Sequence, residues 1–158
     1  MNNLTYGNAR YQNYETMCGG APAGRMNDDR GFSGANAVHV HMTNTRLTDP
    51  EILEMRFPVV VEDFSIRTGS GGNGKFKGGD GVSRTMRFME DMTCAILSSS
   101  RKHAPKGLDG GDDGECGSTL IRRKNGTIEE LAHCDQTEVK TGDAVILNTP
   151  AAGGYGKA

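Results

Sequence analysis

Apolar residues recur along this chain mostly at short, alternating spacing, which predicts strands rather than helices. The strand predicted at 59–67 begins as an apolar run, Val59–Val61, and then alternates, with Phe64 and Ile66 on one face. Further strands are predicted at 37–42, 82–88, 93–98, 118–123, 127–132 and 144–147. The pattern therefore predicts a mainly β fold of antiparallel sheets, arranged as a sandwich or a barrel.

One short helix is predicted after residue 47. Thr48 or Asp49 can cap its N-terminus, and Pro50 suits the first helical position. Glu51 adds an acidic residue to the first turn, where negative charge is favoured. The helix should end before Pro58, because the residue that precedes a proline disfavours helical geometry.

A hairpin is predicted around Asn125-Gly126, since this pair supplies the two positive-φ residues of a type I′ turn. A two-residue loop would place Arg122 opposite Glu129, an opposite-charge pair. The same register would place Leu120 opposite Leu131, an apolar pair on the same face. Turn chemistry and register therefore agree in this prediction.

The chain has 158 residues and 23 glycines, which follow no fixed period. Glycine at this level, with β-branched and aromatic residues between, predicts many tight turns and bulges between short strands. Residues 1–37 contain several of these glycines and show no sustained period. We therefore predict an irregular segment over 1–37 that packs on a preceding region, and a mostly β domain over 38–158.

Charge and composition exclude several classes of protein. A net charge of -2 argues against a nucleic-acid-binding surface, and the apolar runs are far too short to span a bilayer. No signal peptide is visible at the start of the chain. The four cysteines lie far apart without a C-x-x-C pair, as expected for reduced thiols. We expect a cytoplasmic protein that binds neither nucleic acid nor membrane.

Two loops resemble ligand-binding patterns without the context that those patterns need. Gly69–Lys75 has the glycine spacing of phosphate-binding loops, but Gly78-Gly79 cannot continue the helix that must follow. A connection that permits close backbone approach explains this loop better. The acidic loop 109–115 departs from an EF-hand loop at Gly111, and the glutamate at its twelfth position is missing. We therefore assign no cofactor or metal to either loop.

The segment 38–49 carries the densest polar chemistry, with His39, His41, Asn44 and Arg46 between apolar positions. On a strand, His39 and His41 would project from the same face. They could be polar strand residues bonded to nearby backbone, or metal ligands that need further ligands. They could also orient a substrate or the active site of another domain.

Six segments carry a family resemblance, in order along nearly the whole chain. They are 14–20 (YETMCGG), 38–46 (VHVHMTNTR), 48–51 (TDPE), 66–74 (IRTGSGGNG), 78–82 (GGDGV) and 149–156 (TPAAGGYG). Together they resemble the C-terminal portion of the hydantoinase B/5-oxoprolinase family. The tract 134–137 (CDQT) resembles the ATP-dependent 5-oxoprolinases more than the other branches.

The resemblance implies ATP-dependent ring opening of a cyclic amide, in which the complete enzyme converts 5-oxo-L-proline to L-glutamate within glutathione metabolism. It places ATP in an A-type ATPase region and a divalent metal in the N-terminal part of the B-type region. Nothing in this chain resembles either region. The resemblance therefore implies a C-terminal fragment that is inactive alone, with those two regions as its partners in an oligomeric enzyme.

Within this interpretation, His39, His41, Asn44 and Arg46 are the candidate pocket residues. Arg46 could hold the carboxylate of a small anionic lactam through a bidentate contact, and the other side chains could stabilise a developing oxyanion. The alternative is a structural or subunit-interface module of a related hydantoinase or acetone-type carboxylase, with no direct chemical role.

Overall fold

The computed structural model describes residues 1–40 and 44–158. The first sheet has the strand order β10 (Cys134–Val139), β7 (Met92–Ser98), β1 (Asn2–Gly7) and β2 (Gln12–Thr16). The second has the order β5 (Val59–Ile66), β6 (Val82–Phe88), β11 (Ala144–Asn148), β8 (Ser118–Arg122) and β9 (Ile128–Glu130). A short pair, β3 (Gly24–Arg25) and β4 (Gly31–Phe32), and the helix α1 (Pro50–Arg56) complete the described elements.

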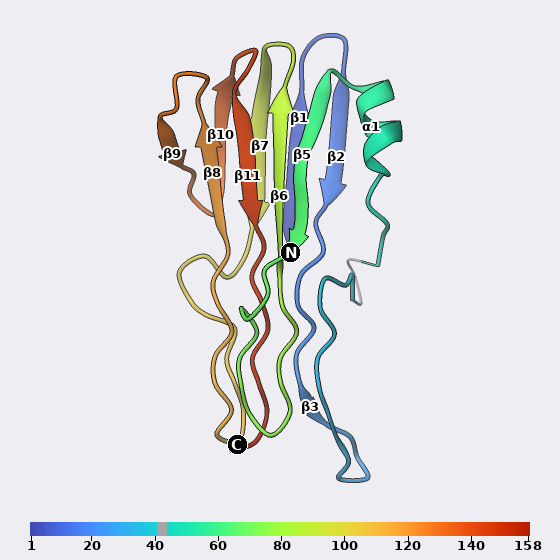
Figure 1. Ribbon diagram of the computed structural model, residues 1–158, viewed down its shortest axis with the longest axis vertical. Coiled ribbons are helices and arrows are strands. Elements are labelled where there is room, and N and C mark those ends of the chain that lie inside the picture. Colours follow the sequence, from blue (N-terminus) through green and yellow to red (C-terminus); the bar gives the residue numbers. More distant parts are fainter. Residues whose placement is uncertain (41–43) are drawn as a thin grey trace.

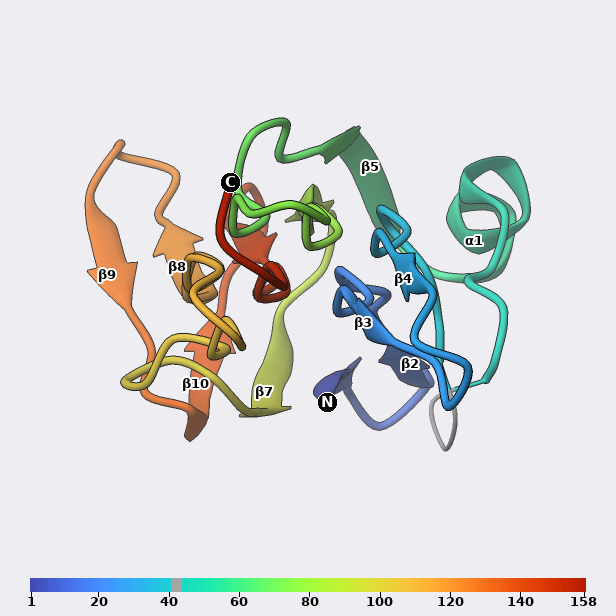
Figure 2. The same ribbon diagram turned by 90° about the horizontal axis from the view of Figure 1, so that it is seen from below.

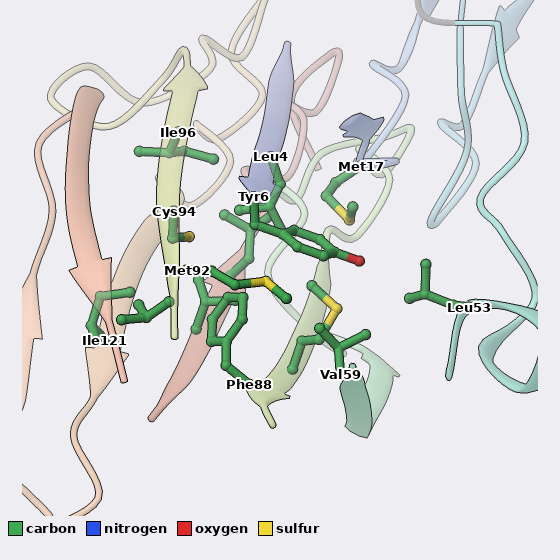
Figure 3. Close-up of a cluster of buried hydrophobic side chains, with 14 residues drawn as sticks. Leu4, Tyr6, Met17, Leu53, Val59, Phe88, Met92, Cys94, Ile96 and Ile121 are labelled. Carbon is green, nitrogen blue, oxygen red and sulfur yellow. The ribbon is translucent and has the colours of Figure 1, made fainter. Parts of the chain in front are cut away.

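The two antiparallel sheets pack face to face, and in the described part of the chain neither closes into a barrel (Figures 1 and 2). Seen from below, β10, β7 and β2 lie on one side and β5 lies on the other (Figure 2). Leu4 and Tyr6 point into the core between the sheets, whereas Thr5 is exposed. The Tyr6 ring meets the edge of Phe88 from the opposite sheet, with ring centroids 5.6 Å apart (Figure 3). The predicted β class is confirmed, in its sandwich form.

Below the sandwich, as drawn in Figure 1, the chain continues as extended segments that contain most of the family-resembling glycines. We call this part, residues 19–38, 67–81, 101–117 and 149–156, the glycine-rich half. Its backbones touch directly: a Cβ at Gly20 would overlap with the carbonyl of Gly79. Hydrogen bonds such as Gly79 N to Ala21 O (2.9 Å) join the segments. A Cβ at Gly72 would overlap with the carbonyl of Asp112, so the close backbone approach predicted for the loop that begins at Gly69 is confirmed.

The prediction that residues 1–37 are irregular is wrong for 2–16. β1 and β2 form a hairpin there, and β1 pairs with β7 along its full length. The pattern failed because only Leu4 and Tyr6 supply alternating apolar positions, among asparagines that disfavour strands. β10 was missed as well, since most of its side chains are polar and exposed.

The helix prediction is confirmed in position and in its caps. Asp49 Oδ1 accepts a hydrogen bond from Glu51 N at 3.0 Å, and Pro50 is the first helical residue. Phe57, which precedes Pro58, is extended with φ −129° and ends the helix. No helix in the described residues is long and apolar enough to cross a membrane.

The hairpin between β8 and β9 is confirmed, but its turn differs from the prediction. Of Asn125 and Gly126, only Gly126 has a positive φ (+89°). Arg123 N donates to Thr127 O, and Gly126 N donates to Arg123 O, both at 2.8 Å. These bonds define a three-residue loop that ends on a left-handed glycine, instead of a type I′ turn.

The longer loop shifts the register, so the predicted pairs of Arg122 with Glu129 and of Leu120 with Leu131 are wrong. Arg122 lies opposite Ile128, and Leu120 lies opposite Glu130. Glu129 instead accepts a hydrogen bond from Arg123 Nε at 2.9 Å. Glu129 is therefore paired with an arginine as the sequence suggested, but with Arg123 instead of Arg122.

We expect Gly126→Ala to lower the free energy of unfolding by about 1 kcal/mol, because alanine disfavours a left-handed backbone. No described atom lies within 4 Å of a Cβ built there, so the cost should come from the backbone alone. Urea unfolding of the variant measures it. Gly126→Asn is the control and should cost less, since asparagine tolerates this conformation; an equal loss in both variants would contradict the assigned turn.

Candidate functional site

The polar segment 38–49 is a loop that the rest of the chain holds at both ends. Val38 pairs with Gly19, with Val38 N to Gly19 O at 2.8 Å. At the other end, Thr48 N donates to Glu15 Oε1 at 3.0 Å. Residues 39–40 and 44–47 belong to neither helix nor strand. The strand predicted at 37–42 is therefore absent from 37–40, and its remaining two residues lie outside the described residues.

The four candidate pocket residues have different environments. His39 is half-buried, and neither ring nitrogen has a hydrogen-bond partner among the described residues. Asn44 and Arg46 are exposed. His41 lies outside the described residues, so its placement beside His39 stays a prediction. No hydrogen bond or ion pair among the described residues joins His39, Asn44 and Arg46, so they do not form a preassembled cluster.

A hollow of about 280 Å³ lies directly beside the start of this loop, and we call it the site hollow. Its lining consists of Met1, Asn2, Met17, Gly19, Gly20, Pro22, Val38, Val40, Ser99, Ser100, Pro105, Lys106, Pro150, Ala151, Ala152 and Gly153. Three of the family-resembling segments, 14–20, 38–46 and 149–156, meet in this lining. The fold thus brings together parts of the resemblance that are far apart in sequence.

The lining of the site hollow is largely apolar side chains and bare backbone. Gly20 and Gly153 present no side chain, and a Cβ at Gly153 would overlap with the carbonyl of Lys106. The Lys106 ammonium is already bound to Asp113 at 2.6 Å, an interaction that raises the pKa of Lys106. Among the described residues, no carboxylate, histidine or cysteine side chain belongs to this lining. The hollow can enclose a small molecule and shield it from water. An acid, a base or a nucleophile for a reaction would have to come from residues outside this lining.

A buried ion pair contacts the end of the 38–49 loop. Glu15 on β2 and Arg84 on β6 face each other across the sandwich, with Oε2 and Nη1 3.3 Å apart and side chains only 5% and 3% exposed. The guanidinium also lies over the ring of Phe64. Because Glu15 also accepts from Thr48 N, the pair fixes the end of the 38–49 loop to both sheets. Sequence reasoning missed this role, although Glu15 lies within the family-resembling segment 14–20.

The comparisons with known proteins agree with this placement of the segments. The family described as Hydantoinase B/oxoprolinase matches residues 1–158. The chain belongs to this family. It is 45% identical to the 5-oxoprolinase of Dictyostelium discoideum over 157 residues and 42% identical to 5-oxoprolinase 1 of Arabidopsis thaliana over 156. Each match covers 99% of this chain and 12% of the relative, so the chain spans about an eighth of those proteins.

A solved structure supports the fold. The ATP-dependent caprolactamase from Pseudomonas jessenii aligns with 98% of this chain at a TM-score of 0.74 and 22% identity, over 28% of the caprolactamase chain. This likeness concerns the fold alone. Hydantoinase B/oxoprolinase membership therefore rests on the sequence match, and the fold is what this chain shares with the caprolactamase.

In this family member, the loop that resembles phosphate-binding loops encloses a carboxylate of its own chain. Asp80 is buried, and its Oδ1 accepts from Gly71 N at 2.7 Å and lies 3.6 Å from Lys77 Nζ. Burial alone would raise the pKa of Asp80, but the bonds from the Gly71 and Gly69 amides and the Lys77 charge hold that pKa below its usual range. Asp80 therefore already accepts the hydrogen bonds from the Gly69 and Gly71 amides, which a phosphate bound in this loop would need.

No three His, Cys, Asp or Glu side chains within 1–40 and 44–158 lie close enough together to hold a metal ion. His39 has two ring nitrogens without a hydrogen-bond partner among the described residues. One imidazole is not a metal site, since a catalytic zinc usually has three protein ligands. The described residues therefore do not fit a resident metal, and no reaction step is assigned to one here.

Proposed function

We propose that this chain is a C-terminal part of an ATP-dependent 5-oxoprolinase, or of a closely related cyclic amidase, and that it is inactive alone. In the complete enzyme the reaction would convert 5-oxo-L-proline to L-glutamate within glutathione metabolism. The observation that carries the proposal is the site hollow, where three family-resembling segments converge without a complete catalytic set. Relatives described as 5-oxoprolinases match 99% of the chain.

The chemistry explains why such an enzyme needs several regions. A lactam carbonyl is a poor electrophile, and phosphorylation of its oxygen by ATP creates a leaving group. A sheltered pocket must then direct water to the carbon and keep other water out. We assign ATP to an A-type ATPase region and the divalent metal to the N-terminal part of the B-type region. This chain would complete the pocket in an oligomeric enzyme. Within the B-type part of that enzyme, residues 1–37 would belong to the preceding region and residues 38–158 would form the C-terminal, mostly β domain.

The loop 38–49 is the part of this chain that we assign to the substrate. Arg46 and Asn44 are exposed on it and available to a ligand or to a neighbouring region. Arg46 would bind the substrate carboxylate, while Asn44 and the histidines would donate to the developing oxyanion. Glu15 would act as a positioning residue, since it holds Thr48 at the end of the loop.

We place the complete enzyme in the cytoplasm. All four cysteines are free, and Cys134 is exposed on β10. A reducing compartment suits an exposed free thiol, which would otherwise be open to oxidation or disulfide exchange.

The test is complementation of the Dictyostelium 5-oxoprolinase after deletion of the region that this chain matches. We expect ATP-dependent glutamate formation only when the chain is supplied. Arg46→Met in the chain should lower kcat/KM roughly 10- to 100-fold, the loss expected for a charge-assisted contact, and should raise KM. Its melting temperature should stay unchanged, because Arg46 is exposed.

Arg56→Met, at an exposed position in the last turn of α1, is the matched control and should turn over normally. Turnover by the isolated chain would refute the fragment proposal. If Arg46→Met and Arg56→Met behave alike in the complemented enzyme, the loop has no part in substrate binding. The chain would then be a structural module of the enzyme.

A further inference from the structure

A second hollow, of about 260 Å³, adjoins the site hollow and shares Ser99 and Ser100 with it. Residues 98–103 and His133 line it, and we call it the basic hollow. Its side chains are three hydroxyls, Arg101, Lys102 and two imidazoles, in a chain whose net charge is -2. The Ser98 and Ser99 hydroxyls already donate to His133 O at 2.9 Å and Met1 O at 3.4 Å, so the hollow is distinguished by the positive charges of Arg101 and Lys102 rather than by free hydroxyl donors.

Arg101 is the central observation, because its charge has no carboxylate partner among the described residues. Nη1 donates to Asn2 Oδ1 at 2.9 Å and to Ser99 O at 3.1 Å, and Nη2 donates to Thr119 Oγ1 at 3.3 Å. Nε is buried and has no partner in the described part of the chain. Burial, and then the charge of Arg67, lowers the pKa of Arg101 to about 10. A half-buried cation held only by neutral groups is costly unless an anion compensates it.

The backbone around Arg101 is shaped to hold it in this position. Ser100, directly before it, has a φ of +55°, a left-handed conformation that costs energy in a residue other than glycine. The Ser100 carbonyl accepts from Gly117 N at 3.0 Å. A Cβ at Gly117 would overlap with Arg101 Nη1, so the glycine makes room for the guanidinium. Strained backbone of this kind is typical of ligand sites.

We propose that the basic hollow binds a small oxyanion, a phosphate or a carboxylate group. The proposal stands independently of the proposed 5-oxoprolinase activity. Lys102, His103 and His133 would surround the anion, while Arg101 compensates its charge from the half-buried side. The volume suits one such group rather than a nucleotide, since ligand pockets for larger molecules start at about 300 Å³. Glu130 lines the adjoining hollow together with Lys102 and would oppose binding.

The probe is inorganic phosphate, titrated into the ¹⁵N-labelled chain at constant ionic strength, with acetate and chloride titrated separately. We expect saturable amide shifts confined to 98–103 and 133, with a Kd in the millimolar range. Lys102→Gln, at an exposed position, should weaken phosphate binding about tenfold without unfolding the chain. Glu130→Gln should tighten it, because it removes the opposing charge.

Lys75→Gln, at an exposed lysine that does not line this hollow, is the matched control and should leave the Kd unchanged. Stronger saturation by phosphate than by acetate would assign a phosphate group, and the reverse would assign a carboxylate. Three results would overturn the proposal: shifts spread over all lysines and arginines, equal shifts with chloride, or equal weakening by Lys75→Gln and Lys102→Gln.

Discussion

Replacement of Glu15 by glutamine should lower the free energy of unfolding by about 3–5 kcal/mol, one of the largest losses available to a single substitution here. The substitution leaves the Arg84 charge buried beside the Met17 sulfur and the Phe64 ring, with no carboxylate paired to it among the described residues. Glutamine keeps an oxygen that can still accept from Thr48 N, so the loss should come from the charge itself. Urea unfolding at neutral pH measures it.

The double variant Glu15→Gln/Arg84→Met separates the missing charge from a packing defect. It removes both charges and fills the same space with an apolar chain, so it should recover most of the lost stability. Glu129→Gln removes an exposed partner of Arg123 and should cost less than about 1 kcal/mol. If the double variant is less stable than the Glu15→Gln chain, the ion pair does not carry the effect.

Gly20→Ala should destabilise the chain by about 3 kcal/mol, at the upper end of overpacking penalties. The added methyl group would overlap with the Gly79 carbonyl and lie 2.9 Å from Ala152 N. Neither obstacle is a flexible side chain, so the backbones of the glycine-rich half would have to separate. Their separation would also weaken the hydrogen bond from Ala152 N to Gly79 O, now 3.0 Å long. Thermal and urea unfolding would show the loss.

Gly69→Ala is the comparison for this effect. Gly69 has a φ of +89°, and a Cβ there would meet no described atom within 4 Å. Its substitution should therefore cost only the backbone strain of about 1 kcal/mol. Equal losses at Gly20 and Gly69 would show that close backbone approach is not what requires glycine at position 20.

Elements with local signals could be predicted from the sequence, and those that depend on distant partners could not. The helix α1 follows from Asp49, Pro50 and Pro58, all within one short stretch. β6 and β7 follow from their own apolar alternation, and β11 follows from its short continuous apolar run. β1 has only two core side chains, and it is a strand because β7, far along the chain, pairs with it.

The candidate site shows the same division. The polar loop 38–49 stands out by composition, but its shape depends on Glu15 and Gly19, which hold its two ends. A buried glutamate is recognisable only once Arg84 is known to face it. The basic hollow needs His133 beside residues 98–103, a proximity that no local pattern encodes.

The glycine-rich half contains positions where steric contact restricts substitution, whereas the exposed loop at 44–46 does not. The segments 66–74, 78–82 and 149–156 carry much of the resemblance, and in them bare backbones touch where side chains would collide. At Gly72 and Gly78, for example, an added side chain would overlap with a neighbouring backbone carbonyl whatever the substrate. The exposed loop at 44–46 is under no such steric restriction. Sequence change can therefore accumulate in that loop while the glycine scaffold stays the same.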